Sequence, residues 1–267
     1  MRSCGLSAVP RSEVGWRASL DVNMPDLAAP ATTGPTTLGA LWRGHVFLFD
    51  KKREPATFGD AAGVRLLLIV AGLEIIRLFR NPLRLSFLPF WLEVPIYLVL
   101  ALAGVRFLAR VGWGQIGFSR WEQWNATEKS YLIQVLLLVN VVFLVLFGDR
   151  VRAALADPSA VWTAFAPYFV YGFYQEVLYR GMLQTELVRR WGPVTGILVS
   201  NLLYTFGPLH YYYFFSKAPI AVPMFASIFA IGVLFAIVFH RTGSLWIVAT
   251  MHAFGNAYAA GTLGLVR

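Results

Sequence analysis

The stretch Tyr131-Leu-Ile-Gln-Val-Leu-Leu-Leu-Val-Asn-Val-Val-Phe-Leu-Val-Leu-Phe-Gly148 contains no charged residue. It follows the polar stretch 121–129 and is close to the ~20 apolar residues that a helix needs to span the hydrocarbon core of a bilayer. A single segment in lipid must satisfy its own backbone hydrogen bonds, which a helix does. The stretch therefore predicts a transmembrane helix and an all-α fold.

Further apolar segments lie on both sides of this one. The segment at 64–79 is weaker because Glu74 and Arg77 interrupt it, so two interpretations stay open: it crosses the bilayer, or it lies in the interface. We expect a polytopic membrane helical bundle of about six to eight transmembrane helices. The expected spans besides 131–148 are 64–79, 86–108, 160–187, 191–210, 219–239 and 244–264.

The composition agrees with a membrane protein. Hydrophobic residues make up 57% of the 267 residues and charged residues only 14%, against about 25% in soluble domains. The net charge of +9 does not indicate nucleic-acid binding, because the basic residues are scattered singly between apolar runs and form no patch. The single cysteine, Cys4, excludes an internal disulfide and a cysteine metal cluster.

Two parts of the chain differ in character. Residues 1–60 hold six of the fourteen acidic residues and a low-complexity stretch, which predicts a largely disordered cytosolic tail. Residues 61–267 form the predicted multi-span membrane domain, and its chemically distinctive part is about 160–260. Lys and Arg are in excess on the side of the tail, so we expect an integral protein of the cell or inner membrane with a cytoplasmic N-terminus.

Acidic residues are scarce in the second half. After Asp157 only Glu176 and Glu186 remain, and Glu186 lies beside two arginines where a helix is expected to leave the bilayer. Glu176 lies within a predicted span, where an ionisable side chain costs roughly 2.5–3.5 kcal/mol on insertion scales. Glu176 is therefore a candidate functional residue.

Polar or aromatic side chains recur at four-residue spacing on three of the predicted helices, and such pairs share a helix face. Carboxylates, imidazoles and carboxamides suit hydrolysis, since they take a proton from water and donate to an oxyanion. Each pair also has a structural interpretation, either as a buried ion pair or as hydrogen bonds between helices. The pairs are Glu176 with Arg180, Phe206 with His210, and His252 with Asn256.

In their order and spacing these pairs resemble the three signature motifs of the CAAX protease and bacteriocin-processing family, which contains the type II CAAX prenyl endopeptidases. The resemblance covers about residues 160–260. It implies a glutamic-type intramembrane endopeptidase in a helical bundle with a polar cavity open to the membrane. Its substrate would be a membrane-anchored or lipidated protein that is cut near the anchor. Its partners would be that protein or peptide and the lipid bilayer, and it would not bind nucleic acid. The oligomeric state is not predicted.

The resemblance also implies roles for single residues. His210 would hold the nucleophilic water, His252 and Asn256 would support the oxyanion, and Arg180 would organise the acidic motif. A carboxylate with two imidazoles also suits zinc, but the chain has no His-Glu-x-x-His spacing. We therefore expect neither a metal nor another cofactor.

One position departs from the family pattern, which begins with two adjacent glutamates. The first of these, the usual water-activating base, is replaced by Gln175, whose carboxamide cannot accept a proton from water at neutral pH. Adjacent helical residues point about 100° apart, so Glu176 does not simply replace it.

Three interpretations stay open at this position. Glu176 acts as base after a small helix rotation, His210 acts as base while Gln175 orients water, or the protein is a catalytically impaired pseudoprotease or immunity-type binding protein on the same fold. A transporter is disfavoured, because neither an inverted repeat nor a pair of Gly- or Pro-broken helices is evident.

Overall fold

The computed structural model describes residues 56–80, 88–124, 126–208, 210 and 220–263. Within these ranges the chain is helical and has no strand, so the predicted all-α fold is confirmed. The expected tail at 1–60, including Cys4, lies almost wholly outside the described residues. Contacts divide the chain into Met1–Gly34 and Pro35–Arg267, and every described helix belongs to the second unit.

The first half of the described chain contains α2 (Asp60–Arg80), α3 (Phe90–Ala103) with its π-helical continuation η1 (Gly104–Ala109), the short 3₁₀ turns η2 (Trp113–Ile116) and η3 (Trp121–Gln123), and α4 (Ala126–Leu155). The second half contains α5 (Pro158–Ala160), η4 (Val161–Phe165), α6 (Ala166–Glu176), η5 (Val177–Gln184), α7 (Thr185–Phe206), α9 (Ala221–Thr242), α10 (Leu245–Asn256) and η7 (Ala257–Thr262).

Three of the described helical stretches are long and apolar enough to cross a membrane: Phe90–Ala109, Glu128–Leu155 and Ala221–Thr242. The second contains the apolar stretch 131–148 and the other two coincide with the expected spans at 86–108 and 219–239. These stretches mark an integral membrane protein. The side on which the N-terminus lies, and the total number of crossings, stay predictions.

Helix α2 explains the two charges that interrupt segment 64–79. Glu74 and Arg77 face inward and pair with each other, and the Oε1 of Glu74 lies 3.3 Å from the Nη1 of Arg77. Arg77 also donates to the Tyr171 hydroxyl on α6. On the other side of α2, Leu68 and Ile75 are 65% and 55% exposed. The charges are thus compensated within the protein, and the apolar side is left for lipid.

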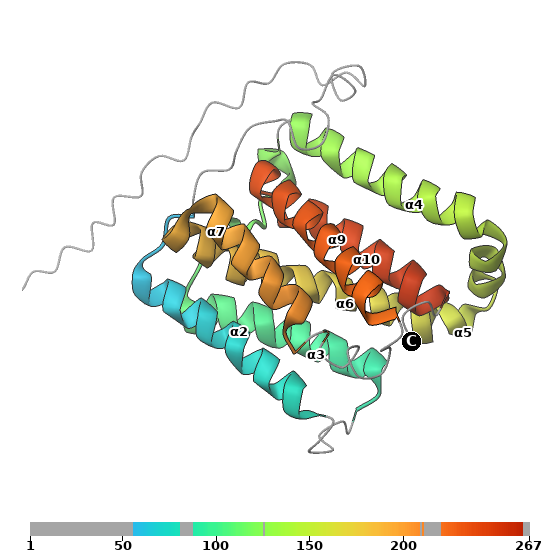
Figure 1. The fold of residues 1–267 in the computed structure, drawn as a ribbon, viewed down its shortest axis with the longest axis horizontal. Helices are drawn as coiled ribbons and strands as arrows, with labels where there is room; N and C mark the ends of the chain where they lie inside the picture. The colour runs from blue at the N-terminus through green and yellow to red at the C-terminus, as the bar shows by residue number, and fades with distance from the viewer. Residues whose placement is uncertain (1–55, 81–87, 125, 209, 211–219, 264–267) are drawn as a thin grey trace, which may run out of the picture. The chain divides into compact units, whose positions relative to one another are not determined.

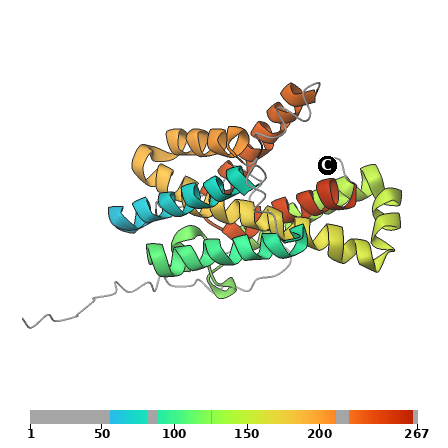
Figure 2. The ribbon, with the colours of Figure 1, turned by 90° about the horizontal axis from the view of Figure 1, so that it is seen from below.

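Helix α6 positions the candidate residues, because α10 packs against it on one side and α3 on another (Figure 1, Figure 2). Gly172 permits the contact with α10: a Cβ there would lie 2.7 Å from the carbonyl oxygen of His252 and 2.8 Å from the Cα of Ala253. The two backbones therefore touch one turn before Gln175, so that the side chains of the two helices meet beyond this point.

Two turns shape the region around α7. Gly192 has a φ of 76°, a left-handed conformation that glycine adopts without strain, and it breaks α7 near the boundary between the expected spans at 160–187 and 191–210. Helix α7 then ends at Phe206 before Gly207 and Pro208. His210 was expected inside a span, and this was wrong: it lies in the turn after the helix, with its backbone N–H donating to the Gly207 carbonyl oxygen at 3.1 Å.

Candidate active site

A cavity of about 420 Å³ lies between α4, α6, α7, α9 and α10. Most of its wall is apolar. Among the residues that line it, Leu138 and Val142 of α4 and Ile231 of α9 are 44%, 41% and 49% exposed, so the cavity is open on the side of these two helices. The polar side chains that line it are Tyr168, Tyr171, Gln175, Tyr204, His210, His252 and Asn256.

Four of the six candidate residues therefore line the same cavity: Gln175, His210, His252 and Asn256. Gln175 and Asn256 are bonded directly, with the Asn256 Nδ2 donating to the Gln175 Oε1 at 2.8 Å. This bond orients the Gln175 carboxamide, because its oxygen faces Asn256 and its NH₂ group faces elsewhere.

Glu176 is fully buried and does not line the cavity, although its neighbour Gln175 does. Its Oε1 lies 2.7 Å from the Nδ1 of His252. Its Oε2 lies 3.5 Å from the Nε of Arg180, so the ion pair expected from the i, i+4 spacing is present. Glu176 thus lies behind His252 as seen from the cavity. It contacts the site through the His252 ring without any rotation of α6.

Arg180 is also fully buried and away from the cavity wall. Its Nη2 donates to the carbonyl oxygen of Gly232 on α9 at 2.9 Å, and its guanidinium carbon lies 4.6 Å from the centre of the Tyr204 ring. Arg180 therefore connects η5 to α9 and α7 while compensating the charge of Glu176.

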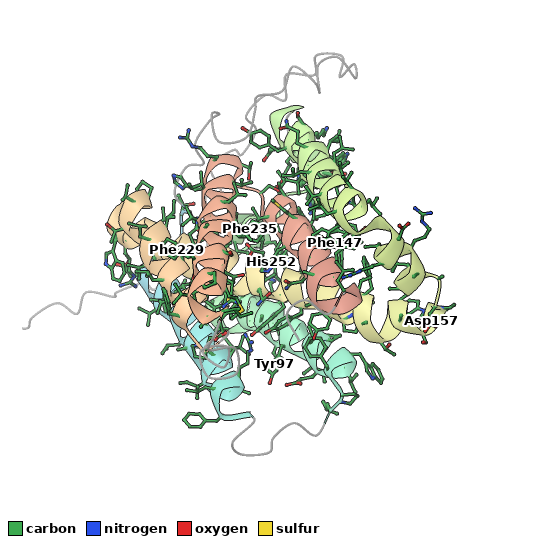
Figure 3. All side chains as sticks on the ribbon, turned by 45° about the vertical axis from the view of Figure 1, so that its right-hand side comes forward. Tyr97, Phe147, Asp157, Phe229, Phe235 and His252 are labelled. Carbon is green, nitrogen blue, oxygen red and sulfur yellow. The ribbon has the colours of Figure 1, made fainter. Side chains whose placement is uncertain are left out.

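Tyr204 links the two histidines. Its carbonyl oxygen lies 2.8 Å from the Nδ1 of His210, and its hydroxyl lies 3.5 Å from the Nε2 of His252, at the outer limit of a hydrogen bond. Since a carbonyl only accepts, the Nδ1 of His210 carries the hydrogen, and Nε2 is the acceptor nitrogen of the neutral ring. His252 also packs against Phe235 of α9, with ring centres 5.0 Å apart (Figure 3).

Three tyrosines of this cavity, Tyr168, Tyr171 and Tyr204, were not predicted from the sequence. Tyr171 lies four residues before Gln175, so helical spacing was a signal that could have placed it on the same face. Tyr204 had no such signal, because its contacts depend on the turn that brings His210 back toward α7. Conversely, Phe206 of the second motif is half exposed and stacks on Phe225, with ring centres 5.6 Å apart, away from the cavity wall.

Among the described residues, no three His, Cys, Asp or Glu side chains are grouped as metal ligands. The carboxylate and one imidazole of the zinc set considered above, Glu176 and His252, are bonded to each other through Nδ1. The expectation of a site without a cofactor stays a prediction.

Comparison with known families identifies the segment that carries the site. Residues 157–258 match the family model described as type II CAAX prenyl endopeptidase Rce1-like. This segment is therefore similar to Rce1-like type II CAAX prenyl endopeptidases. The match contains all six candidate residues, and the resemblance inferred from the three motifs is confirmed. No curated protein and no solved structure matches the chain. The Rce1-like domain relates the protein to the CAAX-type intramembrane proteases.

Proposed function

We propose that the protein is an intramembrane endopeptidase that hydrolyses a peptide bond of a membrane-anchored or lipidated protein near its anchor. The observation that carries this proposal is one cavity with two chemical regions, in which an apolar part between α4 and α9 leads to Gln175, His210, His252 and Asn256. The apolar part suits a lipid chain or an apolar segment, and the polar part suits the adjoining peptide.

The polar groups at this wall are sufficient for metal-free hydrolysis. A general base contributes about 10²–10⁴ to the rate and an oxyanion donor about 10²–10³. Because Gln175 cannot take a proton from water and Glu176 does not line the cavity, we assign the base to one of the two imidazoles. His210 and His252 both line the cavity, so either meets the requirement of position.

A catalytically impaired binding protein is the second candidate, and one observation favours it. Gln175 and Asn256 are neutral groups bonded to each other at the position where the family pattern has a carboxylate. Such a protein would hold an apolar segment or lipid chain in the same cavity without cutting the peptide.

Cleavage by the purified full-length protein in lipid vesicles separates the two functions. The substrates are a prenylated peptide and a peptide with a transmembrane anchor, and mass spectrometry identifies the products. We expect cleavage that is lost in His210→Ala and in His252→Ala but kept in the matched control His240→Ala, since His240 lies at the end of α9 and does not line the cavity.

Cleavage that survives both site substitutions would contradict the proposed site. Binding of the peptides by the wild-type protein without cleavage would favour the binding protein. Elemental analysis and chelation test the metal-free chemistry, because stoichiometric metal together with loss of activity on chelation would contradict it.

A further inference from the structure

The two histidines of the cavity differ in what lies behind them. The Nδ1 of His210 faces a neutral backbone carbonyl, whereas the Nδ1 of His252 faces the carboxylate of Glu176 at 2.7 Å. A carboxylate only accepts, so the Nδ1 of His252 carries the hydrogen and Nε2 is its acceptor nitrogen. A carboxylate behind an imidazole stabilises the imidazolium that forms when the ring takes a proton.

The buried charges behind His252 also bear on the role of its ring. Glu176 and Arg180 are both fully buried, and their opposite charges compensate each other. A positive charge on His252 beside Arg180 would exceed the single negative charge of Glu176, and an excess of buried charge is unfavourable. With Nδ1 bonded to Glu176, the neutral ring presents Nε2 as a proton acceptor, not as an oxyanion donor.

Gln175 has the complementary property. Gln175 lines the cavity and its oxygen accepts from the Nδ2 of Asn256 at 2.8 Å, so its NH₂ group is left to donate to another acceptor. A carboxamide in this orientation stabilises a developing negative charge and cannot activate water.

We propose that two catalytic roles are exchanged relative to those implied by the family resemblance. His252, supported by Glu176, is the general base, and the Gln175 carboxamide donates to the oxyanion. This proposal rests on the proposed function, since it assigns the groups that carry out the hydrolysis.

The steps balance in atoms and protons. The Nε2 of His252 takes one proton from water while the water oxygen bonds to the peptide carbonyl carbon, and the carbonyl electron pair moves to oxygen. The Gln175 NH₂ donates to this oxyanion, and His210 accepts a hydrogen bond from the attacking water. The His252 imidazolium then gives its proton to the peptide nitrogen as the C–N bond breaks, which releases an amine and a carboxylic acid.

The substitution Gln175→Glu distinguishes the two assignments by the sign of its effect. If position 175 holds the base, a carboxylate there raises kcat. If position 175 donates to the oxyanion, a carboxylate removes the donor and repels the charge, and we expect kcat to fall by about 10²–10³. The matched control is Gln123→Glu, an exposed position whose side-chain oxygen accepts from the Arg120 backbone N–H and still does so as a carboxylate.

Glu176 acts through His252 and is a positioning residue. Glu176→Gln keeps an acceptor for the Nδ1 hydrogen but removes the charge, so we expect kcat to fall by about 10² with KM within about twofold. Because this change leaves Arg180 buried without a counter-ion, Glu176→Gln is also tested together with Arg180→Gln, which keeps the pair neutral.

The outcomes separate this proposal from the function on which it rests. Cleavage by the wild-type protein that falls in Gln175→Glu supports exchanged roles. Cleavage that rises or is unchanged in Gln175→Glu overturns the exchange and leaves the endopeptidase intact. Equal kcat in the wild type and in the neutral double variant likewise overturns the role of Glu176. If the folded wild-type protein cleaves neither substrate, the proposed function itself is wrong, and the exchange falls with it.

Discussion

The contact between α6 and α10 is the point at which the smallest change in sequence should have the largest effect on the site. Gly172 has no side chain, and a Cβ at this position would lie 2.7 Å from the carbonyl oxygen of His252. Ordinary contacts of a Cβ begin at 3.4 Å, so Gly172→Ala must move the two helices apart by about 0.7 Å.

The same displacement acts on the hydrogen bonds just beyond Gly172. The bond from Asn256 to Gln175 is 2.8 Å long and that between His252 and Glu176 is 2.7 Å. Lengthening each by about 0.7 Å brings it to the limit of a hydrogen bond. Overpacking costs about 1–3 kcal/mol of stability, and a misplacement near 1 Å lowers rates by up to about 10²-fold.

Thermal unfolding in detergent and the vesicle cleavage assay measure the two effects of Gly172→Ala. The matched control is Gly72→Ala on α2, where a Cβ meets no heavy atom within 4 Å. The control should be as stable as the wild type or slightly more so, by up to about 1 kcal/mol, because alanine favours helix. A Gly172→Ala protein with wild-type melting temperature and kcat would refute this account of the contact.

Three further predictions concern stability. Arg77→Met leaves Glu74 buried without its counter-charge and should cost about 3–5 kcal/mol in thermal unfolding, whereas adding Glu74→Gln should recover most of the loss. Asp60 is hydrogen-bonded to Arg189, and this bond together with the arginine charge lowers the pKa of Asp60 below 3.8. The contribution of the Asp60 carboxylate to folding stability is therefore complete above pH 3.8 and is lost as the pH falls through the lowered pKa. The melting temperatures of the wild type and Asp60→Asn should therefore differ by the same amount from pH 7 to pH 5 and should converge only in stronger acid. Gly192→Ala places a side chain at a φ of 76° and should lower the stability by about 1 kcal/mol, while equal melting curves would show that the turn relaxes.

Several features could be predicted because they depend on local sequence. The stretch 131–148 indicated a spanning helix by apolar length alone, and α4 covers it. The i, i+4 spacing of Glu176 and Arg180 predicted their pairing, since it follows from helix geometry. The three motifs predicted the family for the same reason, because each motif lies within one short segment.

Other features could not be predicted, because they depend on which faces of distant helices meet. The charges of segment 64–79 left open where α2 lies, and only its packing shows Glu74 and Arg77 facing α6. His210 was expected in a helix, but Gly207 and Pro208 end α7 first and turn the imidazole back toward Tyr204. Helix ends of this kind depend on local breakers and on tertiary contacts together.

By itself, the sequence determined an all-α membrane protein, the family of its 157–258 segment and the shortage of acidic residues that singles out Glu176. Tertiary structure alone decided that Gln175 lines the cavity while Glu176 lies behind His252. The physical reason is that neighbouring residues on a helix point in different directions, and the partner that each one meets is set by the close packing of α6 on α10 at Gly172.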